Sequence, residues 1–256
     1  MNSDVSDPME AEFGTVAGWT AQVALDLGPE YYVPAACRGS GQPAALDWLL
    51  GALRPGPDAT MLDAGAGLGG PAAYAAGKTG VRPVLAEPEP AACRAAAALF
   101  GLPVIQADAT GLPFADGAAE LAWCLGVLCT APGPDAQLAM LRELRRVVRG
   151  PVGLLVYLAE TGHLDDPPEG NHFPTTAGLH ELLGQAGLDV EAVAGARDMP
   201  DPPAPWTERT AAVERELQRR FGSTPQLRAA TGQSDRIGRL LGAGQLTFQV
   251  LKLRGK

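Results

Sequence analysis

The chain has 256 residues, of which 46% are hydrophobic and 5% aromatic, and a formal net charge of −9. This length fits one large domain, or one domain with an elaboration, and allows a substantial core. The acidic balance argues against a general nucleic-acid binder, which carries a basic face.

Nothing near the N-terminus predicts export, because no basic segment precedes an apolar run. The longest apolar run, residues 121–131, is too short to cross a bilayer. The four cysteines show no CxxC spacing, so we expect free thiols in a reducing compartment. We therefore expect a cytoplasmic protein without membrane or nucleic-acid partners.

In chain order, residues 1–41 are expected to form a helical cover. Apolar residues recur at helical spacing from Phe13 to about Leu27, and residues 38–41 have the composition of a loop. Residues 42–194 then alternate between helical and strand patterns. Strands are expected to end at Asp63, Glu87 and Asp108, and further strands at about 121–124, 152–158 and 188–194. This alternation predicts a doubly wound, mostly parallel α/β sheet that binds its ligand at the carboxyl ends of the strands.

Residues 195–245 contain two helical stretches, about 207–221 and 225–242, that a bare sheet does not need. We interpret them as a helical insertion that is either a lid over the site or a face for a homodimer. Residues 246–256 supply the last strand. Residues 207–256 hold ten basic and four acidic residues, a surplus that hints at an anionic substrate.

The segment TMLDAGAGLGGPAAY, residues 60–74, carries the clearest chemical signal. An apolar strand ends in Asp63 and is followed by Gly65, Gly67 and Gly69, with a proline suited to a helix start at position 71. Glycines let the backbone turn sharply and approach a ligand. The spacing satisfies GxGxxG, which alone is weak evidence for a dinucleotide.

With Glu87, Asp108 and the segment LPFADG at residues 112–117, this segment resembles the class I S-adenosylmethionine-dependent methyltransferases. The similarity is greatest to the small-molecule type 11 group that includes the ubiquinone and menaquinone C-methyltransferases. It covers roughly residues 42–194 and implies a Rossmann-like methyltransferase fold with a seven-stranded sheet. It also implies S-adenosyl-L-methionine as cofactor and S-adenosyl-L-homocysteine as product.

The resemblance implies a role for each matching position. The three glycines would lie against the methionine and ribose portion, where a Cβ would collide with the ligand. Asp63 would face the ammonium end of the cofactor, and Glu87 would accept hydrogen bonds from both ribose hydroxyls. The remaining cofactor positions are Pro88, Asp108 and Ala109 around the adenine, and Cys124, Leu125 and Arg38 toward the methionine end.

Residues of the acceptor site are harder to predict. Trp19, Tyr31 and Tyr32 are candidates for the substrate pocket, although packing within the helical cover explains them equally well. His172 follows the fifth strand and is the candidate general base, since its unperturbed pKa suits proton removal near neutrality. Many family members have a histidine after the fourth strand, where this chain has Cys129 and Thr130. No metal site is predicted, because His163, Asp165 and Asp166 match no ligand motif.

The sequence thus predicts methyl transfer to a small molecule, of the kind found in secondary metabolism, with O, N or C as the accepting atom. Two alternatives stay open. One is an NAD(P)-dependent oxidoreductase using the same glycines. The other is a methyltransferase-fold protein that catalyses a non-methylating reaction.

Overall fold

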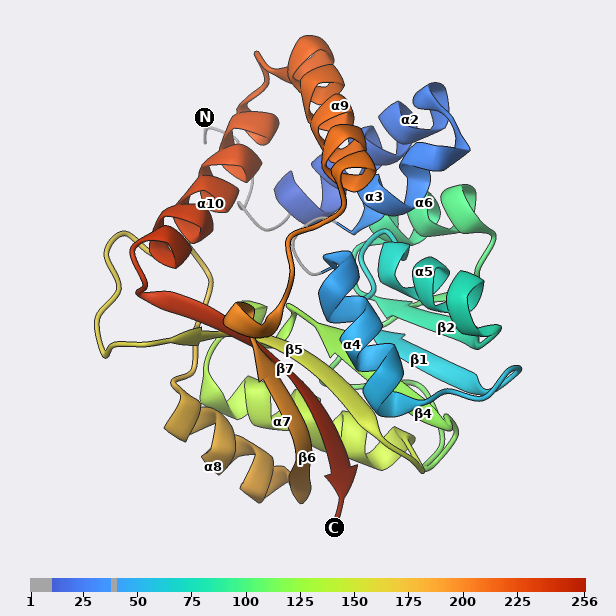
Figure 1. Cartoon of the computed structure of the whole chain (residues 1–256), viewed down its shortest axis with the longest axis vertical. Helices are drawn as coiled ribbons and strands as arrows, with labels where there is room; N and C mark the ends of the chain where they lie inside the picture. The colour runs from blue at the N-terminus through green and yellow to red at the C-terminus, as the bar shows by residue number, and fades with distance from the viewer. Residues whose placement is uncertain (1–10, 38–40) are drawn as a thin grey trace, which may run out of the picture.

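The computed structural model describes residues 11–37 and 41–256, with the side chains of 11–13 left out. Seven strands in these residues form one sheet in the order β3-β2-β1-β4-β5-β7-β6 (Figure 1). Their bounds are β1 Thr60–Ala64, β2 Arg82–Glu87, β3 Val104–Gln106, β4 Leu121–Leu125, β5 Val152–Ala159, β6 Leu188–Gly195 and β7 Leu246–Gly255. β7 runs antiparallel to β5 and β6, and the other pairings are parallel. The doubly wound, mostly parallel seven-stranded sheet is confirmed.

The helices flank this sheet and extend beyond one end of it. Their bounds are α2 Ala17–Leu27, α3 Tyr32–Ala36, α4 Pro43–Leu53, α5 Gly70–Thr79, α6 Pro90–Phe100, α7 Pro134–Val147, α8 Thr176–Ala186, α9 Ala204–Phe221 and α10 Pro225–Gly242. A π-helical turn covers Ala11–Val16, and 3-10 turns cover Pro29–Tyr31, Leu128–Thr130 and Ala196–Asp198. Thr175 caps α8, since its Oγ1 accepts from the Gly178 N–H at 3.1 Å.

Two layers of helices bury the two faces of the sheet. On one face α4 packs Leu46 and Leu49 around the fully buried Trp123 of β4. On the other face α7 and α8 contribute Leu141 and Leu179 to the largest cluster. Burying a side chain of this size stabilises the fold by roughly 1.5–3 kcal/mol. Because both faces are buried, central strands such as β4 and β5 are apolar along their whole length.

The N-terminal helices and the insertion form one continuous cover. α9 packs against α2 and α3 beyond the end of the sheet (Figure 1). Trp19 stacks on Phe221 with ring centroids 4.3 Å apart, and Asp26 forms an ion pair with Arg220. Segments about 200 residues apart in sequence therefore meet here. The sequence assigned no element to residues 30–34, yet the structure forms a 3-10 turn and α3 there.

The basic surplus of residues 207–256 does not make a positive site. Asp166 accepts from Arg236 and Arg239, and Glu191 pairs with Lys252 and Arg254. These partners are acidic residues from earlier in the chain or from β6, and they offset the local charge. These four pairings offset part of the basic surplus on which the hint of an anionic substrate rested.

Candidate functional site

The residues expected to bind the cofactor meet at one edge of the sheet. Asp63 lies near the carboxyl end of β1, Glu87 ends β2, and Asp108 follows β3. The chain order reverses between β1 and β4, which are hydrogen-bonded neighbours. In open α/β sheets such a switch point opens a crevice outside the strand ends, where ligands bind.

The glycine loop has three left-handed positions with different surroundings. Gly65, Gly67 and Gly69 have φ values of 75°, 53° and 77°. A Cβ at Gly65 would lie 2.4 Å from the Val127 side chain, and one at Gly69 would lie 2.7 Å from that of Leu85. At Gly67 no heavy atom of residues 11–37 or 41–256 lies within 4 Å of the added Cβ. At Gly65 and Gly69 an added Cβ would thus collide with protein side chains, while the assignment of these glycines to the cofactor site stays a prediction. Gly67 alone leaves an open approach to the backbone.

Glu87 ties this loop to β2. Its Oε2 accepts from the Gly67 N–H at 2.8 Å, and its Oε1 accepts from the Glu89 N–H at 3.0 Å. The residue is 5% exposed, and burial raises its pKa. Each carboxylate oxygen has about two acceptor sites, so both retain capacity for a ligand hydroxyl. The carboxylate is thereby positioned beside the one open glycine.

Asp63 is a buried carboxyl group without a hydrogen-bond partner for Oδ2 among the described residues. The residue is 2% exposed, and burial raises its pKa to about 7. Trp123, which pairs with Asp63 in the register between β1 and β4, lowers the Asp63 pKa and so offsets part of the effect of burial. Its indole N–H makes no hydrogen bond in the described structure. A buried charge needs an opposite charge or hydrogen bonds. A cationic ligand group at this strand end would supply one, so the site fits an amino-acid ammonium.

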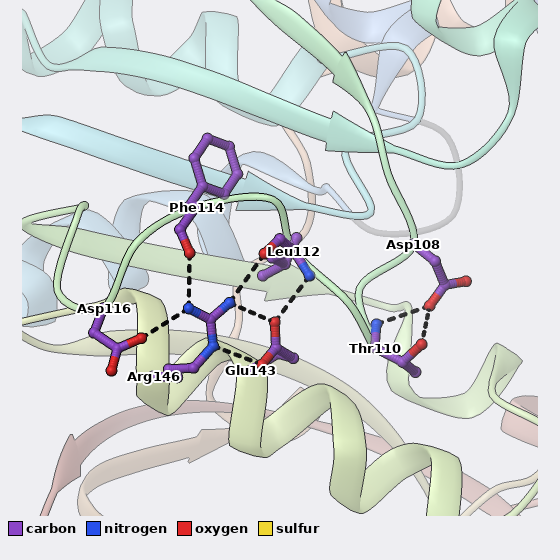
Figure 2. Close-up of polar contacts among 7 residues, drawn as sticks. All are labelled: Asp108, Thr110, Leu112, Phe114, Asp116, Glu143 and Arg146. Carbon is purple, nitrogen blue, oxygen red and sulfur yellow. Dashed lines mark hydrogen bonds and ion pairs between the residues drawn. The ribbon is translucent and has the colours of Figure 1, made fainter.

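Asp108 begins a loop that α7 holds in place (Figure 2). Its Oδ1 accepts from the N–H and the Oγ1 of Thr110 at 2.7 and 2.6 Å, which leaves Oδ2 for other donors. Figure 2 shows the Arg146 guanidinium between Leu112 and Asp116. It donates to the Leu112 carbonyl at 2.9 Å and the Asp116 carboxylate at 2.9 Å, and Glu143 accepts from the Leu112 N–H at 2.9 Å.

The segment LPFADG therefore has a structural role. Arg146 also donates to the Phe114 carbonyl at 2.7 Å and to Glu143 on its own helix. These charge-assisted bonds fix the loop that carries Asp108 and the buried Ala109. The sequence did not reveal these contacts, because Arg146 and Glu143 look like an ordinary ion pair within a helix. Their main partners are backbone groups about 30 residues away.

A cavity of about 410 Å³ lies between the sheet, the N-terminal helices and α9. Its walls come from α2, α3, β5, β7, α9 and α10, and from Cys37, Gly41 and Gln42. The lining residues are Thr20, Pro34, Ala35, Cys37, Gly41, Gln42, Leu155, Tyr157, Trp206, Thr210, Val213, Glu214, Leu217, Leu241 and Phe248. Desolvation raises the pKa of Tyr157 to about 12, so its hydroxyl is protonated near neutrality.

The aromatic residues singled out in the sequence lie elsewhere. Trp19 and Tyr31 pack in the helical cover, and Tyr32 meets Phe100 edge to face at 6.4 Å. None of the three lines the cavity. Arg38 lies outside the described residues. Pro88 is exposed beside Glu87, whereas Cys124 and Leu125 are buried at the end of β4.

His172 lines a different hollow, a groove of about 520 Å³ between α7, α8 and the loop after β5. Its backbone N–H donates to the Cys129 carbonyl at 2.7 Å, and Gln137 donates to its carbonyl at 2.7 Å. These bonds place the His172 backbone beside the segment that follows β4. Its exposed side chain lines this groove and is absent from the lining of the 410 Å³ cavity.

In the described ranges, 11–37 and 41–256, no helix is both long and apolar enough to span a membrane. In the same ranges no group of three or more His, Cys, Asp or Glu side chains lies together in a way that could hold a metal ion. Asp166, one of the acidic residues considered in the sequence, is engaged by Arg236 and Arg239.

Comparison with known proteins agrees with this geometry. Residues 62–156 match the family model described as a methyltransferase domain. No curated protein matches the chain by sequence. Among solved structures, the cyclopropane synthase MmaA2 from Mycobacterium tuberculosis is similar with a TM-score of 0.68 and 14% identity, over 99% of this chain and 100% of that one.

Two further structures have the same fold. The [4+2]-cyclase SpnF is similar with a TM-score of 0.67 and 17% identity, over 96% of each chain. A SAM-dependent methyltransferase from Geobacter sulfurreducens, solved with S-adenosyl-L-homocysteine, has a TM-score of 0.59 and 19% identity, over 84% of this chain and 91% of that one. Residues 62–156 thus match the methyltransferase-domain family model, and the chain has the fold of the class I S-adenosylmethionine-dependent methyltransferases.

Proposed function

We propose that the protein binds S-adenosyl-L-methionine at the β1–β4 edge and transfers its methyl group to a small molecule held in the 410 Å³ cavity. The observation that carries the proposal is the pairing of the open Gly67 with the buried carboxyl group of Asp63 at the same strand end. Gly67 gives a ligand access to the backbone, and the buried Asp63 carboxylate would be stabilised by a cationic group of that ligand.

The chain's residues divide the binding task. Asp63 neutralises the ammonium group, and Glu87 accepts from the ribose hydroxyls while it holds Gly67 in place. The adenine lies among Pro88, Asp108 and Ala109, and backbone groups of Cys124 and Leu125 meet the methionine end. When bound, the cofactor supplies a methyl group already activated on a sulfonium.

The protein's remaining task is to align the acceptor and exclude water. α9 covers the cavity, and Val213 and Leu217 give its wall an apolar surface. This arrangement supports a lid role for the insertion. A base is needed only when the acceptor arrives protonated. His172 stays a prediction for that role, and the cavity itself holds the Tyr157 hydroxyl and the Glu214 carboxylate.

A non-methylating reaction is the second candidate, because the similarity to the [4+2]-cyclase SpnF extends over nearly the whole chain, the helical cover included. Both candidates use the same cofactor site. We also place the protein in the cytoplasm, since its four cysteines are free thiols, as a reducing compartment favours.

Replacing Glu87 with alanine tests the cofactor site. We expect affinity for S-adenosyl-L-homocysteine, measured by calorimetry, to fall at least about tenfold, since two hydrogen bonds and the tether of Gly67 are lost. Glu208→Ala, an exposed position on α9, is the control and should bind like wild type. The proposal would be contradicted if Glu87→Ala bound S-adenosyl-L-homocysteine with unchanged affinity. It would also be contradicted if the wild-type protein bound NADH but not S-adenosyl-L-homocysteine.

A further inference from the structure

We propose that the acceptor is a largely apolar molecule bearing a protonated amine, and that Glu214 is the residue that selects it. This inference rests on the proposed function, since it takes the 410 Å³ cavity as the acceptor site. It concerns how the acceptor is recognised, which neither the fold nor the family determines.

The cavity walls are mostly apolar. Leu155, Val213 and Leu217 are buried side chains that face it, and Trp206 and Phe248 add aromatic surface. Most small-molecule sites combine such walls with a few polar groups that fix orientation. The volume of about 410 Å³ suits a compact ring system with a short side chain.

Among the described residues that line the cavity, Glu214 is the one with a formally charged side chain. The other polar groups of the lining are uncharged, and they include the hydroxyls of Thr20, Tyr157 and Thr210 and the amide of Gln42. Glu214 is exposed, and a carboxylate that borders apolar walls favours a cation and disfavours an anion.

Within the described residues, Glu214 has no counter-ion. In the described structure it takes part in none of the ion pairs, whereas the neighbouring Glu216 binds both Arg219 and Arg220. The positions one helical turn from Glu214 are Thr210, Ala211, Leu217 and Gln218. Side chains at these spacings are the ones that could reach it along the helix, and none is basic.

The aromatic residues reinforce this preference. Tyr157 and Phe248 line the cavity and meet edge to face at 6.3 Å, and Trp206 lines it from α9. A cation near an aromatic face is attracted by the negative potential of the ring. The cavity thus holds two features that recognise an amine.

Two probes of similar shape and opposite charge, tryptamine and indole-3-propionate, test the inference by calorimetry on the full chain saturated with S-adenosyl-L-homocysteine. We expect wild type to bind tryptamine at least about tenfold more tightly. Glu214→Gln should lower that ratio about tenfold, and Glu214→Lys should reverse it. Glu208→Gln, an exposed glutamate on the same helix, should leave the ratio unchanged.

An equal or reversed preference in wild type, a ratio unaffected in Glu214→Gln, or binding of neither probe would overturn the inference. S-adenosyl-L-homocysteine binding is measured separately in each variant, and the probe titrations are repeated without it. If S-adenosyl-L-homocysteine does not bind, the proposed function is contradicted. If it binds normally and the probes show no preference by charge, only the proposal of an amine-bearing acceptor is contradicted.

Discussion

Replacing Gly67 with valine is expected to abolish S-adenosyl-L-homocysteine binding while the protein stays folded. The added Cβ meets no heavy atom of the described residues within 4 Å, so we expect the valine side chain to enter the space proposed for the ligand. A left-handed backbone position costs a residue other than glycine about 1–2 kcal/mol, which a domain with the usual stability of about 5–15 kcal/mol tolerates. Calorimetry measures the binding, and circular dichroism with urea unfolding measures the fold.

Gly65→Val is the matched comparison two residues away. Its Cβ would lie 2.4 Å from the Val127 side chain, so this variant should unfold at much lower urea concentration. If Gly67→Val bound the ligand as wild type does, the loop would not approach the cofactor. If the two variants were equally unstable, the distinction between the two glycines would be wrong.

Replacing Asp63 with asparagine is expected to stabilise the ligand-free protein at pH 8. Burial raises the pKa of Asp63 from 3.8 to about 7, so the folded state holds a proton that the unfolded state has lost across this range. The contribution of Asp63 to the free energy of unfolding is therefore largest below about pH 4 and decreases as the pH rises to about 7. The loss is at most roughly 4 kcal/mol, at about 1.4 kcal/mol per pH unit.

Urea unfolding at pH 5 and pH 8 measures this effect. Asp63→Asn should show a smaller fall in unfolding free energy between the two pH values than wild type, and Asp235→Asn, an exposed position on α10, should behave as wild type. The same variant should bind S-adenosyl-L-homocysteine at least about tenfold more weakly, because the ammonium loses its counter-charge. A ligand-free Asp63→Asn protein less stable than wild type at pH 8 would contradict the account.

Most of the fold was predictable from the sequence because its signals are local. The continuous apolar run at residues 152–158 marks a strand buried on both faces, and Thr175 marks a helix start. The element ends differ from the prediction by a few residues, as in the helix expected from about residue 207 that begins at Ala204. Only backbone periodicity and capping were needed for this part.

The site was predictable only where the strand ends position it. Gly65, Gly67 and Gly69 look alike in sequence, and their different roles depend on Val127 and Leu85, which come from other elements. Local composition does not encode such long-range neighbours.

The 410 Å³ cavity that we propose for the acceptor could not be predicted for the same reason. Glu214, Tyr157 and Thr20 are far apart in sequence and become neighbours only when α9 packs on the N-terminal helices. Trp19, one of the aromatic residues proposed from the sequence for the substrate pocket, instead packs between these helices by stacking on Phe221. Packing between distant helices was the information that the sequence lacked.

The most direct measurement is a crystal structure of the protein grown with S-adenosyl-L-homocysteine. The account predicts the nucleoside at the carboxyl ends of β1 and β2, with its ribose hydroxyls on the Glu87 carboxylate, its backbone contact at Gly67 and its ammonium group facing Asp63. Density for the nucleoside in the groove beside His172, or a fully occupied ligand with no contact to Glu87 or Gly67, would contradict it.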